Sequence, residues 1–127
     1  MTETISGTLW GMAVHMRPIQ ALRLWQKVNL KAVVDGRPDL SMRQLAILTS
    51  IYLDPPPHTV RGLAARLAVT KPVITRALDT MGAMGLLSRH RDENDRRSVL
   101  VKRTVDGALF VERLGDDIVE EAGELPL

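Results

Sequence analysis

Apolar residues recur at helical intervals along the first half of the chain and divide it into amphipathic segments. A first helix is predicted over residues 18–34, because a proline suits the first helical turn and the segment 35–38 breaks the pattern. Ser41 with Gln44 three positions later is a capping-box signature, and it predicts a second helix that ends near Leu53. This second helix is apolar on most sides and is therefore expected to run through the core.

Two short helices are predicted next, with a very short connection between them. Thr59 can cap the third helix, and Thr70 can cap the fourth after a gap of only residues 68–69. Gly85 suits the position just after the end of the fourth helix. The expected buried stripes are Val60, Leu63, Ala64 and Leu67 in the third helix and Ile74, Ala77, Leu78 and Met81 in the fourth.

The last third of the chain changes from helical to alternating periodicity and back. Residues 86–91 and 98–103 are predicted to form two short strands, joined by the highly charged segment 92–97. Thr104 can then cap a final helix that runs to about Glu121. The order predicts a mainly α fold with a small β-hairpin wing, namely a winged helix-turn-helix of four helices, a two-stranded wing and a C-terminal helix.

Length and composition predict one domain. With 127 residues and 45% hydrophobic content, the sequence suits one modest core, assigned to residues 17–127 after an N-terminal arm at residues 1–16. Apolar stretches are too short to span a bilayer and no leader-like segment opens the chain, so we expect a cytoplasmic protein without membrane contact. The absence of cysteine excludes disulfides, thiolate metal sites and thiol-based redox sensing within these residues.

The net charge of +2 conceals an uneven distribution. Residues 61–103 hold ten Lys and Arg against four Asp and Glu, whereas residues 104–127 hold one against seven. A basic block beside an acidic tail is typical of a phosphate-facing surface next to a solvated or partner-facing helix. Charged runs are usually only solvated faces, so the asymmetry supports a function only together with a motif.

The fourth helix supplies such a motif on its polar side. A short helix that follows another after a tight turn is the geometry that places side chains in the major groove. Arg76 can contact a guanine edge, Thr75 can contact a base, and Lys71 and Thr70 can contact phosphate. Each of these residues taken alone could simply lie on the solvent-exposed side of an ordinary helix. Their clustering on one face favours DNA recognition.

The tip of the predicted hairpin carries a second cationic element. Arg96 and Arg97 are long cations on a narrow projection that could enter a minor groove, and Asp95 is close enough to orient one of them. A charged turn often only keeps a hairpin soluble. Behind a helix-turn-helix, DNA contact becomes the better interpretation.

These residues resemble the MarR family of bacterial winged-helix regulators. In that family the helix corresponding to the one with Thr75 and Arg76 reads the major groove, and the arginine of an Asp-x-Arg wing, here Asp95 and Arg97, enters the minor groove. The resemblance implies a homodimer on a palindromic operator, commonly a repressor that covers a promoter and is released by a small, often phenolic ligand. The matching segments are residues 40–44, 59–64, 69–79, 84–87, 95–99 and 104–107.

The sequence departs from the family in its C-terminal part. Only 23 residues follow Thr104, which leaves room for one helix where the family usually adds two that interlock with the first helix in the dimer. The first and last helices are still expected to serve dimerisation. Trp10, Met16 and Trp25 could line a ligand pocket or could simply be core. The expected DNA-binding residues are Thr70, Lys71, Pro72, Val73, Thr75, Arg76, Asp95, Arg96 and Arg97.

Other chemistry finds little support. His15, His58 and His90 are far apart and share no metal-ligand spacing, and no nucleophile motif or phosphate-binding glycine loop is present. We therefore expect neither an enzyme nor a cofactor. Two alternatives to a DNA-binding regulator stay open: a winged-helix module for protein contact without specific DNA binding, and a ligand-binding protein without DNA function.

Overall fold

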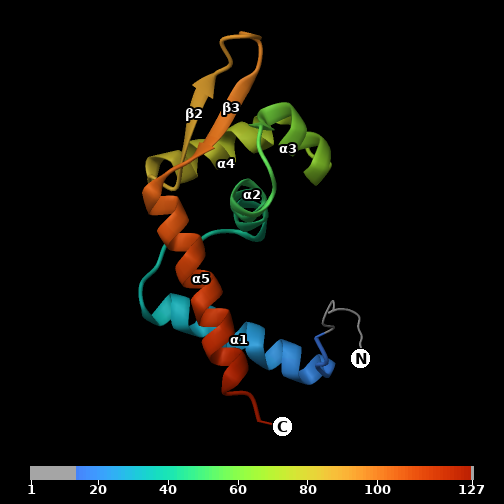
Figure 1. Cartoon of the computed structure of the whole chain (residues 1–127), viewed down its shortest axis with the longest axis vertical. Helices are drawn as coiled ribbons and strands as arrows, with labels where there is room; N and C mark the ends of the chain where they lie inside the picture. Colours follow the sequence, from blue (N-terminus) through green and yellow to red (C-terminus); the bar gives the residue numbers. More distant parts are fainter. Residues whose placement is uncertain (1–13, 127) are drawn as a thin grey trace. The chain divides into compact units, whose positions relative to one another are not determined.

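A computed structural model describes residues 14–126, so Trp10 and most of the expected N-terminal arm lie outside the described residues. The chain divides into two compact units, one of residues 35–116 and one of residues 1–34 with 117–127. Figure 1 shows the elements, which are α1 (Pro18–Val34), α2 (Met42–Leu53), β1 (His58–Thr59), α3 (Val60–Leu67), α4 (Lys71–Ala83), β2 (Leu87–Arg91), β3 (Val99–Arg103) and α5 (Val105–Gly123). The predicted bounds of α1 are confirmed, and those of α2 hold to within a residue.

Side-chain caps begin three of the helices as predicted, among them α5, where the Thr104 hydroxyl accepts from the Gly107 N–H at 3.0 Å. In the capping box of α2, the Ser41 hydroxyl accepts from the Gln44 backbone N–H at 3.1 Å, and the Gln44 amide oxygen accepts from the Ser41 N–H at 2.8 Å. The Thr59 hydroxyl accepts from the Gly62 N–H at 2.9 Å at the start of α3. Thr70 occupies the N-cap position of α4, but its side chain makes no cap hydrogen bond, so the prediction of a Thr70 side-chain cap is wrong.

The larger unit has a core formed mainly by α2, α3 and α4. All four residues of the predicted α4 stripe are buried, and three of them, Ile74, Leu78 and Met81, are buried completely. In α3, Leu63 and Ala64 are buried, while Val60 and Leu67 pack partly buried against the same cluster. The remaining core residues are Ile47, Leu48 and Ile51 of α2 together with Leu86, Leu87 and Val101. The periodicity therefore identified the inner faces correctly.

The sheet has one strand more than the predicted hairpin. β2 and β3 pair antiparallel from Leu87 opposite Arg103 to Arg91 opposite Val99, and this pair forms the wing. β1 pairs antiparallel with the other edge of β3, which gives the order β1-β3-β2. A strand of two residues carries no readable alternation, so only its partner on β3 reveals it. The winged helix-turn-helix fold is confirmed with this addition.

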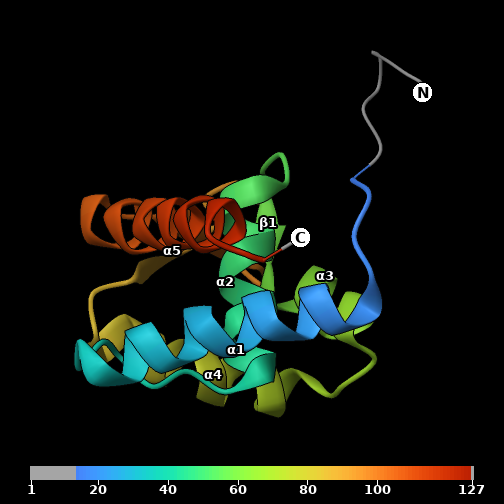
Figure 2. The same cartoon turned by 90° about the horizontal axis from the view of Figure 1, so that it is seen from below.

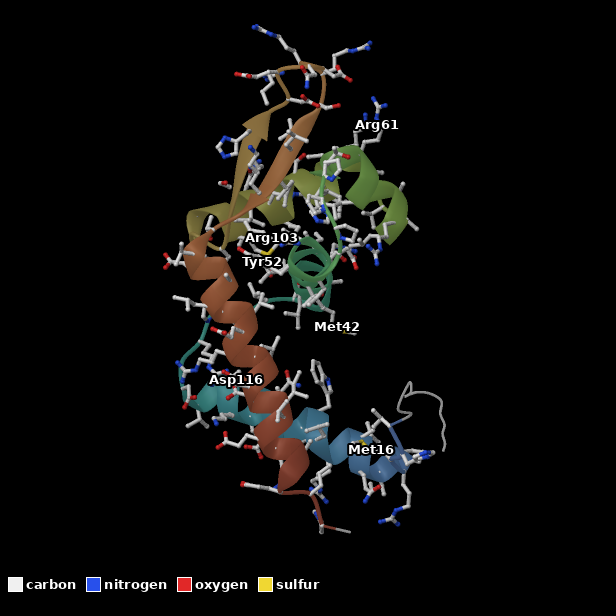
Figure 3. The ribbon with its side chains drawn as sticks, viewed as in Figure 1. Met16, Met42, Tyr52, Arg61, Arg103 and Asp116 are labelled. Atoms are coloured by element: carbon white, nitrogen blue, oxygen red, sulfur yellow. The ribbon has the colours of Figure 1, made fainter. Side chains whose placement is uncertain are left out.

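Tyr52 ties the end of α2 to the start of α5. Its hydroxyl donates to the Leu86 carbonyl at 2.9 Å and accepts from the Thr104 N–H at 2.9 Å, and the Arg103 guanidinium lies 5.8 Å from the ring centre (Figure 3). Gly107 is buried against this junction, where a Cβ atom would collide with the Tyr52 hydroxyl and the Leu86 carbonyl. The close approach explains why a glycine stands in the first turns of α5.

The smaller unit consists of α1, which is uninterrupted (Figure 2), and the end of α5. Lys31 contacts Glu120 at 2.7 Å and the buried Asp117 at 3.3 Å. These two carboxylates, through hydrogen bonds and attraction, raise the pKa of Lys31 above its usual value. Val28 is the one buried residue of α1, and Trp25 is 50% exposed. In the described residues no helix is long and apolar enough to cross a membrane.

Candidate nucleic-acid interface

The turn between α3 and α4 is built by the backbone. Ala68 adopts a left-handed conformation with φ of 56°, and its N–H bonds back to the end of α3. The Val69 N–H then reaches the Ala64 carbonyl at 3.0 Å, which closes the helix end. α4 begins only three residues after Ala68. This tight connection sets α4 against the core by its apolar stripe and leaves its other side to solvent.

The exposed side of α4 carries most of the predicted contact residues. Lys71, Pro72, Thr75 and Arg76 are exposed, as is Thr70 just before the helix. Val73 is half-buried, and it lies nearer the core than the other five. The structure therefore collects these residues at the N-terminal part of one helix, where a major-groove reader needs them.

The wing tip is shaped by Asp95. Its carboxylate accepts from the Arg97 N–H at 3.1 Å and from the Ser98 hydroxyl at 3.4 Å, while its carbonyl accepts from the Ser98 N–H at 2.9 Å. The Arg97 guanidinium lies 3.6 Å from the same carboxylate, and its side chain is 90% exposed. Arg96 is exposed beside it. Asp95 thus holds the turn and one arginine, as its position in the sequence suggested.

The cations of the larger unit differ in whether a carboxylate neutralises them. Arg89 pairs with Asp79 at 2.7 Å, and Arg66 pairs with Asp54. Over the range that the structure describes, no ion pair is formed by Lys71, Arg76, Arg96 or Arg61. The charges on α4, the wing and the start of α3 are therefore available to an outside anion.

Two hollows lie along this surface. One, of about 200 Å³, is lined by Lys71 and Thr75 of α4, by Arg97 of the wing and by Arg61 of α3. The other, of about 160 Å³, is lined by Arg76 together with Arg43 near the start of α2. The first hollow unites the two separately predicted elements. Arg61 was not among the predicted contact residues, because the polar face of α3 was given no role in the sequence analysis.

Comparisons with known proteins agree with this geometry. Residues 40–99 match the MarR family. Over 58 residues the chain is 40% identical to the organic hydroperoxide resistance transcriptional regulator of Bacillus subtilis, a match that covers 46% of this chain and 40% of that protein. The chain thus matches less than half the length of this curated relative.

Solved structures share the fold over most of the chain. The MepR–DNA complex of S. aureus has a TM-score of 0.69 at 22% identity, covering 80% of this chain and 81% of that one. The PcaV transcriptional regulator of Streptomyces coelicolor has a TM-score of 0.60 at 26% identity, covering 84% and 78%. Residues 40–99 of the chain are therefore similar to the MarR family.

The same comparisons bear on the remaining expectations. The family and these structural neighbours are transcriptional regulators and not enzymes, which agrees with the expectation of a non-enzyme. Among residues 14–126, no group of three or more His, Cys, Asp or Glu side chains could hold a metal ion. The roles of the individual contact residues stay predictions.

Proposed function

We propose that the protein is a sequence-specific DNA-binding transcriptional regulator. The observation that carries the proposal is the set of exposed cations on α4 and at the wing tip of a winged helix-turn-helix, of which Lys71, Arg76 and Arg96 form no ion pair with the described residues. Other cations of the same unit are paired with carboxylates, for instance Arg66 with Asp54. A surface that keeps its positive charge on the groove-facing elements favours a polyanion over a protein partner.

Each predicted residue has a role that its position supports. Arg76 and Thr75 read base edges in the major groove, since both are exposed on the first turns of α4. Lys71 and Thr70, at the start of that helix, contact phosphate. Pro72 and Val73 shape the first turn, with Val73 half-buried beneath it. Asp95 orients Arg97, and Arg96 and Arg97 contact the minor groove.

We propose further that the regulator is a homodimer on a palindromic operator. The smaller unit presents large apolar side chains to solvent, and such faces on a regular helix indicate a partner. An isologous dimer matches the two-fold symmetry of a palindrome. The exposed residues of this unit's helices are Ile19, Leu22, Trp25, Leu30, Val33 and Val34 of α1 and Ile118 and Val119 of α5.

Repression by occupying a promoter and release by a small ligand complete the proposal, and both rest on the family resemblance. A structure of the PcaV transcriptional regulator has been solved in complex with its natural ligand, which supports binding of an effector. The proposal does not include the hydroperoxide resistance in the name of the Bacillus relative, because the 127 residues contain no cysteine thiol that a peroxide could oxidise. Of the candidate pocket residues, Met16 is half-buried and Trp25 is exposed.

The test is selection of bound sequences from a random duplex pool at about 0.15 M salt, where non-specific phosphate attraction is partly suppressed. We expect a palindrome with half-sites about one helical turn apart. If nothing is enriched and binding disappears with salt, the regulator proposal fails and the protein-contact module replaces it. A variant with Lys71, Arg76 and Arg97 all changed to Ala is the control and should enrich nothing.

A further inference from the structure

The 200 Å³ hollow between α3, α4 and the wing contains a cation to which the proposed function gives no role. Arg61 lines it together with Lys71 and Arg97, so three cations from three different elements converge there. No carboxylate is among the residues that line the hollow. An open site lined by three cations, of which only Arg97 has a carboxylate beside it, that of Asp95, is suited to a ligand that carries negative charge.

Arg61 differs from the other arginine of the same helix. Arg66, near the C-terminal end of α3, pairs with Asp54. Arg61 is exposed and forms no ion pair with any described residue. Figure 3 shows its side chain leaving the start of α3 on the side turned away from α2. The ion pair with Asp54 accounts for the presence of Arg66. No comparable partner among the described residues accounts for Arg61, which lines the hollow.

The backbone that carries Arg61 is anchored to the wing. Thr59 pairs with Leu100 of β3 and caps α3 through the Gly62 N–H. A Cβ on Gly62 would lie 3.0 Å from the Thr59 hydroxyl, which shows how closely this first turn is packed. The short strand β1 thus joins the start of α3, which carries Arg61, to the tip-proximal end of β3. This gives a function to the strand that sequence patterns did not reveal.

The position of the hollow between α4 and the wing indicates which anion it would meet on a bound duplex. On a duplex, one backbone strand always separates a major groove from the adjoining minor groove. If α4 occupies the first and the wing tip the second, that strand must pass between them, and the hollow lies there, lined by residues of both. A guanidinium fork and an ammonium group are the side chains that bind phosphate most strongly.

We propose that Arg61, together with Lys71, binds a backbone phosphate of the strand between the two grooves, while Arg97 at the edge of the hollow continues into the minor groove, and that this contact fixes the wing's register relative to α4. The inference rests on the proposed function and adds a contact that is independent of base sequence. Arg61 therefore contributes equally to operator and random duplex. Its contribution weakens as salt rises, because the phosphate contact releases counterions.

The experiment compares Arg61→Ala with Arg66→Ala, which removes the same charge from the same helix away from the hollow. Affinity for the selected operator and for a random duplex is measured from 50 to 200 mM salt. Loss of one phosphate contact makes the negative slope of log K against log [salt] shallower by about 0.9. The ratio of wild-type to Arg61→Ala affinity should therefore fall about 3.5-fold over this range. Arg66→Ala should keep the wild-type slope, and Arg61→Lys should nearly restore it.

The outcomes separate this inference from the function on which it rests. If the wild type selects a sequence but Arg61→Ala and Arg66→Ala have the same slope, the phosphate contact is wrong and the regulator remains. If the wild type binds no duplex, the proposed function fails as well. Titration with inorganic phosphate in the absence of DNA distinguishes the source. Saturable binding that Arg61→Ala abolishes, with an unchanged DNA slope, would assign the hollow to a free anion and overturn the proposal.

Discussion

α4 and α1 are both amphipathic helices with a proline in the first turn, yet their apolar faces meet different environments. The stripe of α4, which includes Ile74 and Leu78, is completely covered by the chain itself. On α1 only Val28 is buried, while Leu22 is 65% exposed. The apolar face of α4 is thus covered within the chain, whereas the apolar face of α1 stays largely exposed. Substitutions on the two faces of each helix test this difference.

The largest effect is expected on the apolar face of α4. Leu78→Ala removes a completely buried side chain from the core and should lower the free energy of unfolding by about 2–5 kcal/mol. Leu53→Ala, at the 74%-exposed end of α2, is the matched control and should change it by less than about 0.5 kcal/mol. Urea denaturation measures both. Equal losses would mean that burial does not distinguish these two positions.

The apolar face of α1 should affect association more than folding. Trp25 is half-exposed on that face, and aromatic residues are frequent anchors of interfaces. Trp25→Ala should raise the dimer dissociation constant about 30-fold, equivalent to about 2 kcal/mol. Sedimentation equilibrium gives the constant, with Arg23→Ala on the same helix as the control. A wild type that stays monomeric at all concentrations would contradict the proposed dimer.

The polar face of α4 should control specificity and leave stability unchanged. Arg76 is exposed and carries no ion pair, so Arg76→Ala should cost about 1–3 kcal/mol on the selected operator and little on random DNA. Fluorescence anisotropy on both duplexes measures the two losses. Equal losses on the two duplexes would mean that Arg76 contacts phosphate and does not read a base.

The same contrast explains how far the sequence could be interpreted. Helix bounds and the buried stripe of α4 were predictable, because capping residues, proline and periodicity act locally. β1 was not, since two residues form a strand only when the far edge of β3 is present. The Thr70 side-chain cap was expected from residue type alone and does not form. Arg61 became a candidate only when folding brought it beside Lys71 and Arg97.

The smallest effect belongs to the polar face of α1, where Lys31 contacts Glu120 and the buried Asp117. Because these carboxylates raise the pKa of Lys31, its charge stabilises the folded state below the ordinary value of 10.5, as long as the two carboxylates are ionised. That stabilisation is lost as pH rises through the raised pKa. The urea midpoint of the wild type should therefore exceed that of Lys31→Gln by a small, constant amount across neutral pH. The gap should close above pH 10.5. A gap that persists in strong alkali would show that Lys31 acts through the packing of its alkyl chain and not through its charge.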